Sequence, residues 1–161
     1  MKTSASWLVL AVCIVVVWFV MRPQIEAPPP TRTVEFFYYN AEQDKDEQGQ
    51  LLCSQEGLVP VSREVAADAS TQNILEQFLR GELSDEERAA GVTTEFPLEG
   101  LTLDTVQQQD NTLILTFSDP LNKTSGGSCR ASILWAQIEA TAKAIENVEQ
   151  VQFLPEELFQ P

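Results

Sequence analysis

The sequence of 161 residues contains no histidine. Histidine is the side chain that most often serves as a general base near neutral pH, and it is the most common ligand of transition metals. Its absence argues against Ser–His and Cys–His catalytic pairs and against histidine-based metal centres. We therefore predict a protein that is not an enzyme and that carries no cofactor.

Positive charge is also scarce. The chain has 10 Lys and Arg residues against 24 Asp and Glu residues, which gives a formal net charge of −14 at pH 7. Nucleic-acid binding depends on basic side chains that neutralise phosphates, so this balance argues against a nucleic-acid partner. It also argues against docking on an anionic lipid surface. A basic or neutral protein, or a glycan, is easier to accommodate.

Cysteine is rare, with three residues in the chain. Cys13 lies within an apolar run, which leaves Cys53 and Cys129 as a pair in the remaining sequence. In an oxidising compartment an even number of cysteines suggests a disulfide, and the alternative is two buried free thiols. A bridge between these two, 129 − 53 = 76 residues apart, would contribute roughly 4 kcal/mol in the chain-entropy model.

One long apolar run is present, at residues 5–21. A spanning helix needs about 17–25 such residues, and Trp7 and Trp18 lie near the two ends, where interfacial rings are found. A cleaved secretory signal would need an A-x-A-like site after the run, and none follows. A lipoprotein signal would end at Cys13, but Val12 stands there in place of a small residue. We predict that residues 1–22 form an uncleaved transmembrane signal anchor.

A spacer and one domain follow the anchor. Residues 23–32 contain four prolines and predict an extended linker of polyproline character. Residues 33–161 read as one domain. The basic residues that flank the apolar run are nearly balanced, so charge alone does not set the orientation in the membrane.

The pattern of apolar residues in the domain predicts an α+β fold. Ser70 is an expected helix N-cap, and Ser84 with Glu87 forms a capping-box pattern that ends at Gly91. Apolar residues at helical spacing from Ala131 to Ile145, Trp135 among them, predict a long helix with this stripe as its core face. The expected order is strand 33–39, strand 58–65, helix 71–80, helix 85–90, a hairpin over 101–117, helix 128–147 and strand 148–154. We predict a small mixed or antiparallel sheet with two main helices packed on one face, preceded by the transmembrane helix.

Several segments together resemble the GerMN domain, a module known from sporulation and germination lipoproteins and from other bacterial envelope proteins. In order they are Leu58–Val65, Phe78–Gly81, Ser84–Gly91, Phe96–Gly100, Thr112–Asp119, Trp135–Ile138 and Val148–Phe153. The resemblance covers about residues 33–155. It implies a small α+β fold, related in shape to ring-building motifs, that is used for protein–protein contact at the cell surface. The family has no established catalytic residues that could be assigned to positions of this chain. This chain has one copy where the germination proteins have two, and an apolar anchor where they have a lipid, so the resemblance implies a general envelope role.

The acidic segment after the first strand contains a partial calcium-loop pattern. Asp44, Asp46 and Gln48 occupy the first, third and fifth positions of a D-x-D-x-x-G match. The twelfth position, which supplies the bidentate carboxylate in such loops, is Gln55, with Glu56 one residue late. This is a weak calcium candidate beside the simpler interpretation of a solvated acidic loop, and we predict no metal site.

Glycan hydrolysis would need two carboxylates at a defined separation. Asp85, Glu86 and Glu87 are instead explained as acidic residues in the first turn of a helix, where the helix dipole favours them. No G-x-S-x-G or S-x-x-K pattern supports acyl transfer.

We predict a non-catalytic protein–protein interaction or assembly module at the bacterial cell envelope. The cysteine pair and the GerMN resemblance favour a single-pass protein of the cytoplasmic membrane whose C-terminal domain is extracytoplasmic. The expected partner is an envelope protein or peptidoglycan, and self-assembly into a homo-oligomer is a sub-case. The first alternative is a calcium-binding surface adhesion module, and the less favoured one is a cell-wall glycan hydrolase.

Overall fold

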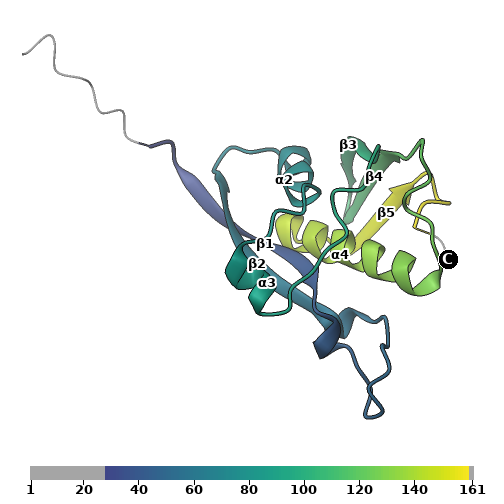
Figure 1. Ribbon diagram of the computed structural model, residues 1–161. Coiled ribbons are helices and arrows are strands. Elements are labelled where there is room, and N and C mark those ends of the chain that lie inside the picture. Colours follow the sequence, from purple (N-terminus) through teal and green to yellow (C-terminus); the bar gives the residue numbers. More distant parts are fainter. Residues whose placement is uncertain (1–27, 160–161) are drawn as a thin grey trace, which may run out of the picture.

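The computed structural model describes residues 28–159 (Figure 1). The predicted anchor, residues 1–22, and the first half of the linker, residues 23–27, lie outside the described residues. None of the helices that the structure describes combines the length and apolar character that a membrane span needs. The strands are β1 (Thr31–Tyr39), β2 (Leu58–Ala66), β3 (Thr102–Gln109), β4 (Thr112–Ser118) and β5 (Gln150–Leu154), and the α-helices are α2 (Thr71–Phe78), α3 (Asp85–Ala89) and α4 (Ser128–Glu146).

The α+β class is confirmed, but the strands form two sheets where the sequence predicted one. β1 and β2 make an antiparallel pair, and β3, β4 and β5 make a second sheet in that order. The second sheet is mixed, because β4 pairs antiparallel with β3 and parallel with β5. Figure 1 shows α4 running between the two-stranded pair and the three-stranded sheet, with α2 beside it.

The sheets are separate because other groups already bind the second edge of β1, the one that faces away from β2. The backbone N–H of Phe37 donates to the Thr141 hydroxyl on α4, at 2.9 Å. Tyr39 and Thr93 exchange two backbone hydrogen bonds on the same edge, at 3.1 and 2.7 Å. A helix and a loop thus cover an edge that would otherwise accept another strand.

Pro60 fits β2 for a related reason. It lies opposite Phe37 in the antiparallel register, and the Phe37 N–H points away from β2. The two residues therefore form a non-hydrogen-bonded pair, in which both N–H groups point outward. A proline at this position removes no ladder bond, which suits an edge strand such as β2.

The predicted helix caps are confirmed. The Ser70 hydroxyl accepts from the Asn73 N–H at the start of α2. At α3 the Ser84 side chain accepts from the Glu87 N–H while the Glu87 carboxylate accepts from the Ser84 N–H, which completes the capping box. The first strand begins at Thr31, two residues before the predicted start.

One hydrophobic core joins both sheets and the helices. Alternate residues of β4, Leu113, Leu115 and Phe117, are buried, as the hairpin pattern predicts. They share the core with the aromatic residues Phe36, Tyr38, Phe78 and Phe96 and with the apolar side of α4. This packing holds α4 against β5, and the candidate site lies beside these two elements.

Candidate interaction site

The structure uses the first candidate calcium ligand, Asp44, as a buried structural group. Its carboxylate accepts hydrogen bonds from the Tyr39 hydroxyl, from the Ser54 hydroxyl at 2.5 Å and from the Ser54 N–H at 2.7 Å. Burial acts to raise the pKa of Asp44, but the bonds from Ser54 and Tyr39 outweigh it and lower the pKa. Burial, together with the bond to Asp44, raises the pKa of the Tyr39 hydroxyl above its ordinary value. The group joins both ends of the loop between β1 and β2.

The other two candidates lie in a separate exposed turn. The Asp46 carboxylate accepts from the backbone N–H of Gln48 at 2.9 Å and of Gln50 at 2.7 Å. These contacts shape the turn. Within residues 28–159 no three His, Cys, Asp or Glu side chains are grouped so as to hold a metal ion.

The predicted disulfide between Cys53 and Cys129 is present, with Cα atoms 5.2 Å apart. It joins the end of the acidic loop to the first turn of α4. The loop is therefore held at both ends, by Asp44 on the β1 side and by the disulfide on the α4 side.

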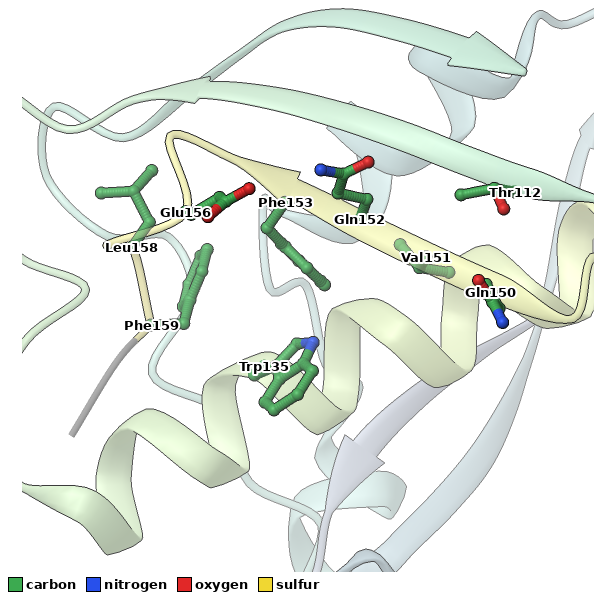
Figure 2. A pocket seen from close by; sticks show the side chains of 9 residues that line it. All are labelled: Thr112, Trp135, Gln150, Val151, Gln152, Phe153, Glu156, Leu158 and Phe159. Atoms are coloured by element: carbon green, nitrogen blue, oxygen red, sulfur yellow. The ribbon is translucent and has the colours of Figure 1, made fainter. Parts of the chain in front are cut away.

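A hollow of about 450 Å³ lies beside α4 and β5 (Figure 2). Trp135 forms one wall and is 43% exposed. Figure 2 shows Phe153 pointing from β5 toward the indole of Trp135, with Phe159 next to it. Trp135 meets Phe153 edge to face at a centroid distance of 6.0 Å, and Phe153 meets Phe159 at 5.5 Å. Trp135 is thus the exposed member of an otherwise buried aromatic cluster.

The hollow follows the outer edge of β5. Successive side chains of a strand point to opposite faces of the sheet. Residues 150–153 nevertheless all line the hollow, two from each face. The hollow therefore reaches both faces of β5 around its outer edge, and Thr112 of β4 lines it as well.

A second, smaller hollow of about 160 Å³ lies on the other side of Trp135. It is lined by residues of the acidic loop and of α4, among them Cys53 and Glu139. The indole therefore stands between two depressions. The disulfide, by fixing the loop on α4, forms part of the wall of the smaller one.

The predicted core stripe of α4 is confirmed for Ala131, Leu134, Ile138 and Ala142, but the inclusion of Trp135 was wrong. Residues advance by about 100° along a helix, so Trp135 lies at the border of a stripe centred near Leu134 and Ile138. The sequence analysis also missed Phe159 as a core residue, because it follows the last predicted strand. The sequence did contain a signal that Trp135 is exposed. Its angular position on the helix places it next to the polar residues Ser132 and Glu139.

Each of these two hollows, and a third one beside α2, is lined by a single carboxylate. The large hollow contains Glu156, the smaller one Glu139, and a third, beside α2, Glu146. Glu139 pairs with Lys143 at 2.8 Å, and Glu146 accepts from the Thr71 hydroxyl. Glycoside hydrolysis needs two carboxylates facing one substrate.

The acidic residues at the start of α3 have the predicted structural role. Glu87 also receives two hydrogen bonds from the Arg63 guanidinium, at 2.6 and 2.8 Å. These bonds lower the pKa of Glu87, and burial opposes them only in part. The pair fastens α3 to β2.

Comparisons with known proteins agree with the fold. The solved structure of the tandem GerMN domains of the sporulation protein GerM from Bacillus subtilis matches with a TM-score of 0.53 at 15% sequence identity. The match covers 84% of this chain and 43% of that chain, so this chain spans less than half of the tandem protein. No curated protein matches the chain. The family model described as "Germane: Sporulation and spore germination" matches residues 36–157, and the chain belongs to this family.

Proposed function

We propose that this protein is a non-catalytic protein–protein interaction module, anchored in the cytoplasmic membrane by residues 5–21, with its domain on the extracytoplasmic side. The observation that carries the proposal is the hollow under Trp135. A large amphipathic ring exposed beside a concave surface that mixes aromatic, aliphatic and polar groups is typical of sites that bind another protein.

The chemistry of the hollow supports binding over catalysis. The lining residues are aromatic, aliphatic or uncharged polar groups, with Glu156 as the sole ionisable side chain among the described ones. Acid–base chemistry on a glycan would need a second carboxylate. The description of the family names sporulation and spore germination, which is compatible with a role in assembly at the envelope.

The disulfide supports the extracytoplasmic location. Disulfides persist in oxidising compartments and are rare in the reducing cytosol. Added protease on intact cells tests this part of the proposal. Digestion of the domain without lysis is expected, and protection until lysis would contradict the location.

Site-specific photo-crosslinking tests the binding role. A benzophenone amino acid replaces Trp135 in the full-length protein in its own bacterium, and a matched control carries it at Glu64, which is exposed on β2. Position 135 is expected to give discrete crosslinked protein products that position 64 does not give. Identical products at the two positions, or none at 135, would contradict the proposed site.

A further inference from the structure

The strand edges of the described domain differ in how they are protected from pairing with a strand of another chain. The second edge of β1 is covered by Thr141 and Thr93. The outer edge of β2 carries Pro60, which has no N–H to offer, and the charged residues Arg63 and Glu64. Prolines and charges on an edge are common devices against pairing with another chain.

β3 is protected in a different way. Its register shifts between Leu103 and Thr105, which marks a β-bulge at Asp104. The Gln72 side chain of α2 donates to the Leu103 carbonyl at 3.4 Å. A bulge twists an edge away from regular pairing.

β5 has none of these devices. Its sequence, Gln-Val-Gln-Phe-Leu, contains no charge and no proline, and no other described strand pairs with its outer edge. The Gln150 N–H donates to the Asn111 carbonyl at 3.2 Å, on the β4 side. Because backbone groups alternate along a strand, the N–H and C=O of Val151 and Phe153 point to the outer edge. The hollow runs along that same edge.

Acidic residues stand at both ends of this edge. Glu149 precedes β5, and Glu156 and Glu157 follow it, all three exposed. The wider domain adds to the negative field. Within the described residues, six Lys and Arg side chains are already paired with carboxylates, in a chain with 24 acidic residues. Such a field attracts a cationic partner.

We propose that the outer edge of β5 binds a short extended segment of a partner protein, added as a further strand, with Lys or Arg at each end and apolar side chains at alternate positions. This inference rests on the proposed binding function and names the chemistry of the partner. The five residues of β5 span about 16 Å, so a segment of similar length brings its basic ends to the acidic ends of the edge. Its apolar side chains lie against Trp135 and Phe159.

Charge argues against a second copy of this chain as the occupant. Two β5 edges paired antiparallel about a two-fold axis would place Glu149 of each copy near Glu156 and Glu157 of the other. Like charges at close range oppose such pairing. A basic segment converts the same positions into attractive contacts.

The test uses the full-length protein in detergent and the capped peptide Lys-Thr-Val-Thr-Phe-Thr-Lys as the probe. Two control peptides are matched to it: one has Glu in place of both Lys residues, and one is N-methylated at its three central residues. The N-methylated peptide keeps the side chains but cannot pair as a strand. Amide NMR spectra and hydrogen exchange give the readout at individual residues.

The Lys peptide is expected to slow exchange of the Val151 and Phe153 amides about tenfold or more. The amides of Gln150 and Gln152, which face β4, are expected to change little. The Glu peptide should bind at least about tenfold more weakly, and the N-methylated peptide should give no protection. Equal binding of either control peptide would overturn the proposal.

Protein variants test the charge requirement. The triple variant Glu149→Gln, Glu156→Gln and Glu157→Gln is expected to weaken binding of the Lys peptide about tenfold. A matched triple, Glu35→Gln, Glu64→Gln and Asp68→Asn on the β1–β2 side, should leave it unchanged. Equal losses in the two triples would overturn the proposal.

Three further outcomes identify which part of the proposal fails. Protection of Val151 and Phe153 that rises with protein concentration and needs no peptide would assign the edge to a second copy. Absence of peptide binding, with specific crosslinks still formed at position 135 in cells, would reject strand addition and leave the binding function standing. Absence of both would reject the two together.

Discussion

The hydroxyl of Thr141 on α4 accepts a hydrogen bond of 2.9 Å from the backbone N–H of Phe37, on the edge of β1 that faces away from β2. Thr141 is fully buried. A single side chain of the long helix therefore satisfies one backbone donor on this strand edge. This contact holds the two-stranded pair against the helix that also supports the second sheet.

Replacing Thr141 with Val keeps the shape of the side chain but leaves the Phe37 N–H without its acceptor. A buried unsatisfied donor costs about 1–3 kcal/mol, so we expect Thr141→Val to lower the free energy of unfolding by this amount in urea denaturation. Exchange of the Phe37 amide should accelerate. Thr141→Ser keeps the hydroxyl and is the matched control. A Val variant as stable as wild type would show that another group accepts this bond.

Reduction of the Cys53–Cys129 disulfide should destabilise the domain. The bridge closes a separation of 76 residues, and removal of a native disulfide typically costs about 2–5 kcal/mol. We expect dithiothreitol, or the double variant Cys53→Ser and Cys129→Ser, to lower the urea midpoint. Cys13→Ser is the control and should leave it unchanged. A midpoint unaffected by reductant would contradict the structural role of the bridge.

The buried Asp44 carboxylate should make stability fall in acid. The folded protein lowers its pKa relative to the unfolded chain, so protons bind the unfolded chain more readily. The contribution of Asp44 is therefore present above the ordinary pKa of aspartate, about 3.9, and is lost as the pH falls through the lower folded value. We expect the stability difference between wild type and Asp44→Asn to shrink as the pH falls below about 4. A difference that stays constant down to pH 2 would contradict the shift. Asp68→Asn, on an exposed turn after β2, controls for the lost charge.

Glu87 combines two roles that two substitutions can separate. It is 21% exposed in its ion pair with Arg63, and its carboxylate also completes the capping box of α3. Glu87→Gln removes the charge but keeps an acceptor for the Ser84 N–H, because glutamine also occupies this position of a capping box. We expect it to cost about 1 kcal/mol, and Glu87→Ala to cost about 0.5–2 kcal/mol more. Urea denaturation at low and high salt provides the measurement. Equal losses in the two variants would show that the cap adds nothing.

Much of this fold follows from local chemistry in the sequence. The serines at the starts of α2 and α3 and the alternation of β4 predicted the elements correctly, because caps and burial patterns depend on neighbouring residues. The division into two sheets did not follow, since it depends on Thr141 meeting Phe37 across 104 residues. The exposed Trp135 was missed for a similar reason. Its side chain lies at the border of an apolar stripe, and only the position of β5 decides whether a border residue is covered.

The last prediction concerns Gly81, which follows α2 with φ of +63°. A Cβ at this position would lie 1.9 Å from the Phe96 carbonyl oxygen, so the backbone of one segment would have to move. Gly49 has a similar φ of +79°, but a Cβ there would meet nothing within 4 Å. Gly49→Ala therefore measures the backbone strain alone, about 1–2 kcal/mol. Gly81→Ala adds the collision, and we expect it to cost more than about 4 kcal/mol or to prevent folding. Urea denaturation and yield of soluble protein compare the two variants. Equal effects would show that the Phe96 segment can move aside, and that the approach of these two segments does not constrain the fold.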